Sequence, residues 1–522
     1  MRCPVPWYEL YISAPQNRIS TCCYYGGPTI DLNEVTSNGK EVEAVWGDPK
    51  IKAIRKLQSN AADDGENGCS KCHFFQKRPD RTEDTYVNFK AWLAADLSPK
   101  QRANLELAKH DFEHGVVETA ARPLRYFLLF GFHCNIDCIM CVQIPGRKKQ
   151  EQELSWDLLK KWWPGFDSAL SVDVIGGEPF AIPSAIRFIR EFVADESLQP
   201  VKLNLFTNGT VVHKHLELLK RKRRLGFSIS LDSIGEGYET IRCGSKWERL
   251  RENLLTLRTL IDTTHPEWHM GTSALMMKAA VPYLADYARF HVENRISTVF
   301  HTLTVSRGIE ESVYRDDIIS YPLLLRGVPN WRQHFDDAIA IFEAHDRPSE
   351  TALLIMFRDR CAEGIAQLAG LFVESRDMPL VVAEGAGVLD AQDREFGYNN
   401  GAVTRNDAGV FSFPANHIHQ AHFLRFAPAE PPTDGILRVR MWWADEAPSL
   451  NDTACDITFD EQPNYRLLCW DEGTDQRGRF KELTIMRCDG AASAEFEITL
   501  RAARVGLRTV FPTALTAFGT GR

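Results

Sequence analysis

The sequence of 522 residues lacks several features that would assign a chain to a particular class. It has no apolar run approaching the roughly 20 residues that cross a bilayer, and its first residues lack the apolar core of a signal peptide. It has no low-complexity tract, and its formal charge of −9 gives it no general attraction to polyanions. We therefore expect a cytoplasmic protein whose partners include neither a membrane nor a nucleic acid.

The composition is that of an ordinary globular chain. Hydrophobic residues make up 44% and charged residues 25%, which indicates neither disorder nor a fibrous repeat. At roughly 100 to 200 residues per domain, the length favours about three domains. The chain contains 13 cysteines, and clustered cysteines in a reducing compartment are more often metal ligands than disulfides.

Changes of pattern along the chain predict five segments. Residues 1–90 are rich in Cys, Gly, Asn, Asp and Pro and have only short apolar runs, so we expect a small unit, poor in core, that a metal stabilises. Residues 91–121 form a helical connector, with a capping box at Ser98 and Gln101. Residues 122–310 form the central domain and 311–377 a helical segment, and residues 378–522, with their period of two, predict a β-sandwich.

The central domain alternates short β-rich runs with helical segments. This alternation predicts an α/β fold in which a parallel sheet, with right-handed crossovers, forms a full or partial barrel. Active groups then lie at the carboxyl ends of the strands. We interpret a basic run, Lys220–Arg224, as the solvated end of a helix over 212–224. The expected strands are Tyr126–Phe132, Val172–Ile175, Lys202–Phe206, Gly226–Leu231, Thr272–Met277 and Thr298–Thr304.

Three cysteines, Cys134, Cys138 and Cys141, directly follow the first expected strand. Thiolates at this spacing can each take a different iron of one iron–sulfur cube. Three ligands leave the fourth iron open, and an open metal position is a catalytic feature. The alternative interpretation is a zinc knuckle or three inert thiols.

With this loop in this place, the sequence resembles the radical SAM superfamily, whose signature is CxxxCxxC after the first strand of a partial (β/α)6 barrel. Met140 stands where the family usually has an aromatic residue. The resemblance covers about residues 1–310. It implies a [4Fe–4S] cluster whose open iron binds S-adenosylmethionine (SAM), and an external reductant such as flavodoxin or ferredoxin. Reductive cleavage of SAM then yields a 5′-deoxyadenosyl radical.

Further motifs end the second, third and fourth expected strands, where this family places its SAM contacts. Residues 176–179 resemble the GGEP motif, in which glycines let the backbone approach a ligand and the carboxylate can accept from the methionyl ammonium. Residues 207–209 match the family's TNG motif. The spacing of Ser230 and Arg242 matches that of a ribose contact and a clamp for the SAM carboxylate. The expected SAM-binding residues are Gly176, Gly177, Glu178, Pro179, Asn208, Ser230, Asp232 and Arg242.

The amino-terminal cysteines resemble those of a SPASM or twitch module, placed before the barrel. The resemblance implies an auxiliary [4Fe–4S] cluster held by Cys3, Cys22, Cys69 and Cys72, with Cys23 left aside. Cysteine spacing alone does not distinguish iron from zinc, so a four-thiolate zinc site is the alternative.

Cys243 directly follows Arg242 and is a candidate hydrogen-atom donor, because a thiol near a substrate radical can invert a carbon centre. Some radical SAM epimerases resemble this arrangement, so the preferred interpretation is an epimerase acting on a sugar or glycosylated natural product. A set of aromatic residues in the last segment could stack on sugar rings, or could only pack in the core. The rival interpretations are a peptide maturase that forms thioether or carbon–carbon crosslinks, and a zinc-stabilised binding protein without catalysis. The aromatic set comprises Trp442, Trp443, Trp470 and Tyr465.

Overall fold

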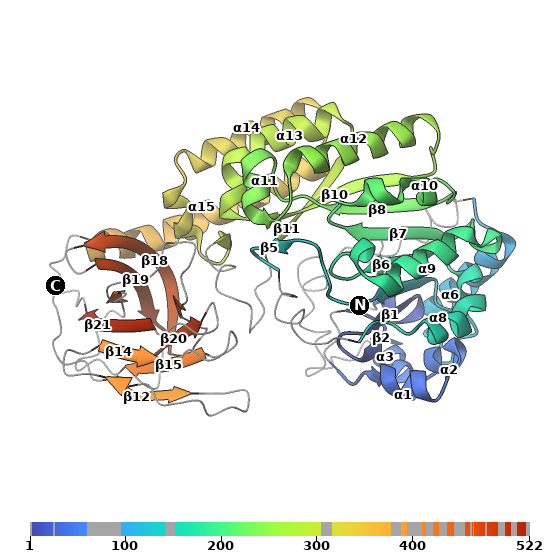
Figure 1. Cartoon of the computed structure of the whole chain (residues 1–522), viewed down its shortest axis with the longest axis horizontal. Coiled ribbons are helices and arrows are strands. Elements are labelled where there is room, and N and C mark those ends of the chain that lie inside the picture. The colour runs from blue at the N-terminus through green and yellow to red at the C-terminus, as the bar shows by residue number, and fades with distance from the viewer. Residues whose placement is uncertain are drawn as a thin grey trace. The chain divides into compact units, whose positions relative to one another are not determined.

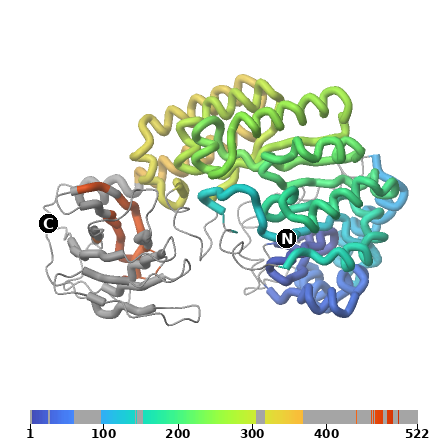
Figure 2. The backbone as a smooth tube through the Cα atoms, in the orientation of Figure 1, coloured from blue at the N-terminus to red at the C-terminus, as the bar shows by residue number. Residues whose placement is uncertain are grey.

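The computed structural model describes residues 3–23, 27–59, 96–141, 143, 152–303 and 316–376, and after these the strands named below with a few adjoining residues. The chain forms two compact units. Figure 2 traces its backbone, coloured by residue number. The first comprises residues 1–275 and 286–301, and the second comprises residues 276–285 and 302–522.

A nine-stranded sheet forms the centre of the first unit, in the order β11-β10-β8-β7-β6-β4-β1-β2-β3 (Figure 1). The six expected strands are neighbours in chain order, and the printed pairs from β4 to β10 are parallel. The α/β class with a large parallel sheet is therefore confirmed, while closure into a partial barrel stays a prediction. These strands are β4 (Arg125–Leu129), β6 (Ser171–Ile175), β7 (Lys202–Thr207), β8 (Leu225–Ser230), β10 (His269–Met276) and β11 (Ser297–Thr302).

In β7 and β10, buried residues alternate with more exposed ones, which indicates that one face of the sheet is covered there. In β7, Leu203 and Leu205 are fully buried, whereas Asn204 and Phe206 are half-buried. Helix α9 buries apolar residues at a spacing of three and four, as expected for a helix packed on a sheet. The helices around the six strands are α6 (Pro99–His114), α8 (Trp156–Trp162), α9 (Pro183–Ala194), α10 (Leu216–Leu219), α11 (Gly235–Ile241), α12 (Trp247–Thr263) and α13 (Leu284–Glu293).

The amino-terminal segment joins the main sheet and is not poor in core. Strand β1 (Glu9–Ser13) is buried throughout and pairs in parallel with β4, and Trp7 and Tyr8 just before it are fully buried. The prediction of a core-poor unit is wrong here, because the short apolar run at 7–12 shares the core of the larger sheet. The remaining elements are β2 (Arg18–Ser20), β3 (Ile30–Asp31), α1 (Leu32–Ser37), α2 (Val42–Trp46) and α3 (Pro49–Ser59). The capping box at Ser98 and Gln101, which begins α6, is confirmed.

The second unit contains helices followed by antiparallel sheets. The 3-10 helix η8 (Pro322–Gly327), α14 (Trp331–Ala344) and α15 (Pro348–Arg376) precede a four-stranded sheet, β12-β15-β20-β17, and a six-stranded sheet, β13-β14-β21-β16-β19-β18. The strands are β12 (Val388–Asp393), β13 (Thr404–Arg405), β14 (Val410–Phe413), β15 (Ala421–Phe426), β16 (Ile436–Trp442), β17 (Cys455–Thr458), β18 (Tyr465–Asp475), β19 (Gly478–Arg487), β20 (Phe496–Ala502) and β21 (Thr509–Ala517).

The aromatic residues expected in this last segment pack within their own unit where the structure describes them. Buried Tyr465 of β18 meets Phe496 of β20 with ring centroids 5.4 Å apart, which links the two sheets. Trp470 lies edge-on to Tyr321, with 5.5 Å between centroids. These contacts favour the core-packing alternative. Trp443 and the side chain of Trp442 lie outside the described residues, so sugar contact stays a prediction.

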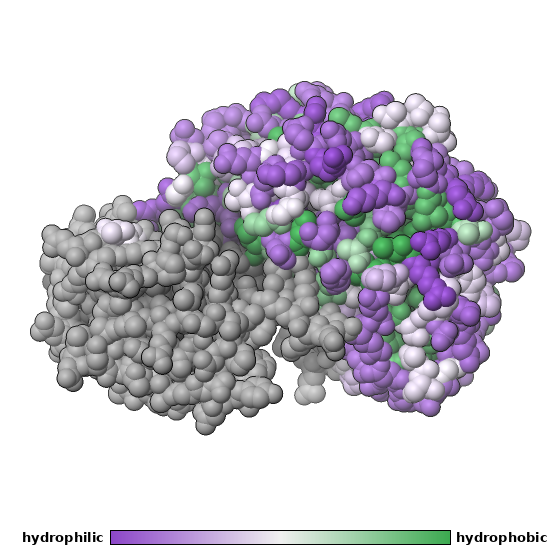
Figure 3. All heavy atoms as spheres, viewed as in Figure 1, coloured by the Kyte–Doolittle hydropathy of each residue, from purple (hydrophilic) through white to green (hydrophobic). Residues whose placement is uncertain are grey.

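The visible surface of the described part intersperses hydrophobic residues with hydrophilic ones (Figure 3). Across the described residues, the large hydrophobic side chains that are exposed are Leu107, Val299 and Met356, which are far apart in the sequence. Within the described ranges, no helix combines the length and the apolar character needed to cross a bilayer.

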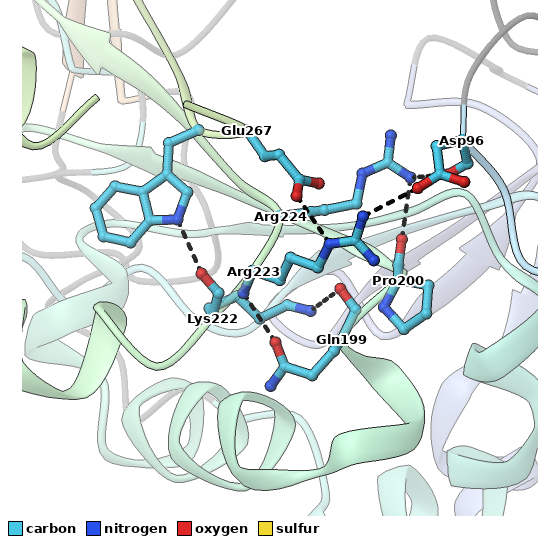
Figure 4. A network of polar contacts seen from close by, with 8 residues as sticks. Asp96, Gln199, Pro200, Lys222, Arg223, Arg224 and Glu267 are labelled. Atoms are coloured by element: carbon cyan, nitrogen blue, oxygen red, sulfur yellow. Dashed lines mark hydrogen bonds and ion pairs between the residues drawn. The ribbon is translucent and has the colours of Figure 1, made fainter. Parts of the chain in front are cut away.

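The basic run Lys220–Arg224 directly follows α10, which ends at Leu219, and Lys220, Arg221 and Arg223 are exposed as expected, but Lys222 is not. Lys222 is fully buried and donates to the carbonyl oxygens of Leu198 (2.6 Å) and Gln199 (3.1 Å). Arg223 pairs with Asp96 and Glu267, at 3.0 and 2.8 Å, and Figure 4 shows the network. Lys222 is thus a buried hydrogen-bond donor within an otherwise exposed basic run, which the charge pattern alone did not reveal.

Burial lowers the pKa of Lys222 to about 7. An unfolded lysine holds its proton to a pKa of about 10.4, so between pH 7 and 10 the unfolded state binds more protons and stability rises with pH. We expect the unfolding free energy of the parent, relative to Lys222→Met, to increase across this window in chemical denaturation. Lys220→Met, at an exposed position of the same run, is the matched control for loss of a lysine side chain. If the difference in unfolding free energy between the parent and Lys222→Met does not change from pH 7 to 10, the lowered pKa of Lys222 is contradicted.

Candidate functional site

The three-cysteine loop leaves the carboxyl end of β4. Its middle part forms β5 (Asp137–Cys138), which pairs antiparallel with β9 (Arg242–Cys243), so that Cys138 lies opposite Arg242. Cys138 is buried, whereas Cys134 and Cys141 are half-buried. The loop is therefore joined directly to the segment that follows the fourth strand of the series.

The two glycines at 176 and 177 let the end of β6 pack backbone to backbone against this loop. Gly177 N donates to Gly131 O at 2.9 Å, and Glu178 N donates to His133 O at 2.8 Å. A Cβ atom on Gly177 would lie 2.1 Å from His133 O, and one on Gly176 would lie 2.7 Å from Gly131 O. The close approach that we expected toward a ligand is thus made toward the chain itself, immediately before Cys134.

The carboxylate of Glu178 ties the second strand to the third. It is fully buried and accepts from Thr207 Oγ1 (2.8 Å), Asn208 N (2.7 Å) and Phe180 N (3.1 Å). Burial raises the pKa of Glu178 to about 7, although these donors act to lower it. The side chain thus fixes the TNG turn, and its contact with a SAM ammonium group stays a prediction.

Asn208 carries this connection on to the first cysteine. Its Nδ2 atom lies 3.7 Å from Cys134 Sγ and donates to Asn135 Oδ1 at 2.9 Å. Its Oδ1 atom accepts from Thr210 N at 3.0 Å, so both ends of the amide are held. Gly209 follows with φ of +73°, a conformation that glycine adopts without strain.

Arg242 lies between a buried carboxylate and the middle cysteine. Its Nε atom donates to Asp232 Oδ2 at 2.7 Å, and its Nη1 atom lies 3.5 Å from Cys138 Sγ. Asp232 is held in turn by Leu275 N, which donates to Oδ1 at 2.8 Å. Two sides of the guanidinium therefore face groups of this chain, and its expected role as a SAM carboxylate clamp stays a prediction. Ser230 is half-buried at the end of β8.

Burial raises the pKa of the Cys138 thiol to about 11, while the charge of Arg242 acts in the opposite direction. The thiol alone therefore keeps its proton at neutral pH. Metal binding requires the thiolate and displaces that proton.

Cys243 lies beside this site but faces the other way. Alternation along the β5–β9 ribbon places Cys243 and Asp137 on one face, and Cys138 and Arg242 on the other. The first two residues are exposed and the last two are buried. Cys243 Sγ lies 3.3 Å from the carbonyl oxygen of Thr240.

The auxiliary cysteines that the structure describes lie toward the amino ends of β1 and β4, whereas the three-cysteine loop lies at the carboxyl end of β4. Cys3 precedes β1, whose first residue is level with that of β4. Cys22 and Cys23 follow β2, which runs antiparallel to β1 and so leads back to the same end. A five-residue strand such as β4 spans about 17 Å, which sets the scale of their separation from Cys134. A hydrogen bond with Cys22 lowers the pKa of Cys23, so both thiols lie together and the choice between them stays open.

Cys69 and Cys72 lie outside the described residues, so the auxiliary cluster stays a prediction. Throughout the part of the chain that is described, no group of three or more His, Cys, Asp or Glu side chains is arranged to hold a metal ion. An iron–sulfur cube poses a different geometric demand from a single ion, since each thiolate takes its own iron.

Sequence reasoning missed the β5–β9 ribbon and the polar residues that link the motifs. A two-residue strand has no periodicity to detect. Thr207 was visible within the TNG motif, but its bond to Glu178 depends on two strand ends meeting. Asn135 and Asn253, which donates to Gly209 O at 2.7 Å, carried no signal in the sequence.

No family model and no curated protein matches the chain. Solved structures that resemble parts of it include Streptococcus suis SuiB bound to S-adenosylmethionine, with 15% identity, a TM-score of 0.32, and coverage of 45% of this chain and 53% of SuiB. Native anSMEcpe with bound AdoMet is 14% identical, with a TM-score of 0.30 and coverage of 42% of this chain and 60% of anSMEcpe. TYW1 with a lysine-pyruvate adduct bound is 12% identical, with a TM-score of 0.25 and coverage of 41% of this chain and 70% of TYW1. The chain thus spans about half of SuiB and less than two thirds of anSMEcpe. A likeness at this level carries no conclusion about activity.

We expect Gly177→Ala to displace the three-cysteine loop, because its Cβ would lie 2.1 Å from His133 O. Overpacking of this kind costs about 1–3 kcal/mol, measurable by denaturant unfolding. Gly131→Ala is the matched control, since its Cβ would meet nothing closer than 3.7 Å. Equal unfolding free energies for the two variants would contradict this description of the loop.

Proposed function

We propose that this chain is a radical SAM enzyme, with Cys134, Cys138 and Cys141 as the ligands of a [4Fe–4S] cluster. The observation that carries the proposal is the position of these thiols after the carboxyl end of β4, the first of the six expected strands. There the GGEP and TNG turns fasten the loop through backbone and side-chain hydrogen bonds. Catalytic groups collect at this edge in parallel α/β folds.

The residues present fit such a cluster. A guanidinium directed at Cys138 and an amide directed at Cys134 favour thiolates, which are the metal-binding form of cysteine. When bound, the cluster and SAM would supply reductive cleavage of SAM to a 5′-deoxyadenosyl radical, which abstracts hydrogen from a substrate. The electron would come from an external reductant such as flavodoxin or ferredoxin.

We place SAM and the substrate on the face of the sheet that carries the half-buried residues of β7 and β8. Ser228 and Ser230 of β8 are half-buried on this face, as are Asn204 and Phe206 of β7. Hydroxyl and amide groups beside an aromatic ring can bind a polar nucleoside. Ser230 is the residue we assign to the ribose, in keeping with its place at the end of β8.

We expect the anaerobically reconstituted protein to contain iron and sulfide, and to form 5′-deoxyadenosine from SAM when reduced. Replacing Cys134, Cys138 or Cys141 by Ala should abolish this product, because each thiolate holds one iron. Liquid chromatography with mass spectrometry measures the product, and Cys361→Ala, at a buried cysteine far from the loop in sequence, is the control. A protein that binds zinc and leaves SAM intact would instead be the non-catalytic binding protein.

For the reaction itself we propose epimerisation of a sugar or glycosylated natural product, with Cys243 as the hydrogen-atom donor. The exposed position of Cys243 next to β5 supports this choice, because a donor thiol must regain its hydrogen between turnovers. Its ribbon face, opposite to that of Cys138, requires that the substrate reach it from the solvent side. The thiyl radical left on Cys243 would need one electron and one solvent proton to become a thiol again, and Cys3, Cys22, Cys69 and Cys72 would hold the auxiliary cluster that supplies the electron. Peptide crosslinking is the alternative, for which no donor thiol is required.

We therefore expect Cys243→Ala to cleave SAM yet lose inversion of the substrate, with deuterium from solvent entering one carbon of the product in the parent only. Cys243→Ser replaces the weak S–H bond by a strong O–H bond with little change in shape, so it should give the same result as Cys243→Ala. Mass and NMR spectra of the product provide the measurement. Inversion at the parent's rate in both variants would show that Cys243 is not the donor.

A further inference from the structure

We infer that Arg242 and Asn208 set the reduction potential of a cluster bound by Cys134, Cys138 and Cys141, because each aims a hydrogen-bond donor at one of these sulfur atoms. The inference rests on the proposed function. It gives Arg242 a positioning and tuning role distinct from the clamp for the SAM carboxylate that the resemblance implies.

The arginine donor is fixed on both sides. Arg242 is 8% exposed, and its Nε bond to Asp232 fixes the plane in which Nη1 approaches Cys138 Sγ. Asp232 is itself 2% exposed and held by Leu275 N, so it cannot leave without exposing or stranding a buried charge. The β5–β9 pairing adds a second constraint, because it sets Arg242 directly across from Cys138. The contact between charge and sulfur is therefore built into the fold.

The asparagine donor is fixed by the turn after β7. Asn208 is 5% exposed, and its Oδ1 atom accepts from both the backbone N and the Oγ1 of Thr210, at 3.0 and 2.7 Å. With the oxygen held there, only Nδ2 can face Cys134 Sγ, 3.7 Å away. Glu178 holds the backbone of the same residue. The amide orientation is thus determined by its partners.

Hydrogen bonds to ligating sulfur atoms are among the factors that set iron–sulfur potentials. A donor withdraws negative charge from the sulfur and so favours the reduced cluster, which carries one more electron. A charged donor acts more strongly than a neutral amide. Both donors should therefore make the potential less negative, and Arg242 should contribute more than Asn208.

The test is an EPR-monitored redox titration of reconstituted full-length protein without SAM, in Arg242→Gln and Asn208→Ala. The relevant signal is the one that Cys138→Ala abolishes, which separates it from an auxiliary cluster. We expect a more negative midpoint in both variants, with the larger shift for Arg242→Gln. Arg242→Lys keeps a positive charge beside Asp232 and serves if the Gln variant does not fold. It should give a smaller shift in the same direction.

The control is Asn253→Ala, which removes a buried asparagine that holds Gly209 O but touches none of the three sulfur atoms. Its midpoint should equal that of the parent. A parent-like midpoint in Arg242→Gln or Arg242→Lys with a full complement of iron would overturn the inference and leave the proposed function standing. If Asn253→Ala and Asn208→Ala shift the midpoint potential equally, the role given to Asn208 is overturned, because a loosened turn after β7 would explain both shifts. A parent protein without any cluster would overturn both proposals.

Discussion

The contact between the backbone at 176–178 and the backbone at 131–133 is the constraint on which the site depends. Two strands that run side by side end level with each other, but their following loops can touch only where no Cβ intervenes. This contact places Glu178 in the interior, where its carboxylate needs hydrogen-bond donors. Thr207 and Asn208, at the end of the next strand, provide them.

From that point the connections run back to the cysteines. Asn208 contacts Cys134, and on the other side Asp232 holds Arg242 against Cys138. The ends of four consecutive strands thus converge on one short loop through polar contacts in a buried setting. Buried polar networks of this kind are costly unless fully satisfied, so their satisfaction here indicates a rigid, preorganised site. Preorganisation is what a reaction with an open metal position requires, since its ligands must not rearrange between turnovers.

The six central strands and the motifs of the site were predictable from sequence, because both depend on residues close together in the chain. The six strands alternate with amphipathic helices, and the cysteine, GGEP and TNG motifs stand at the carboxyl ends of three of these strands. The capping box at Ser98 is equally local and was found in the same way. These features need no knowledge of how distant segments meet.

What sequence could not predict depends on long-range pairing. The apolar run at 7–12 is too short to form a core alone, but β1 pairs with β4 and shares the core of the larger sheet. This pairing joins residues far apart in sequence, such as Glu9 and Arg125, which are 116 positions apart. Lys222 reads as a surface charge until the carbonyl groups of Leu198 and Gln199 are brought to it. The outward face of Cys243 likewise follows from a two-residue ribbon that no periodicity announces.

The proposed site is tested most directly by asking whether SAM binds to the cluster at this loop. We predict that adding SAM to the reduced, reconstituted protein changes the g values of the EPR signal that depends on Cys138, because the ligand would complete the coordination of the open iron. An unchanged spectrum at saturating SAM, from a protein with a full complement of iron and sulfide, would contradict it.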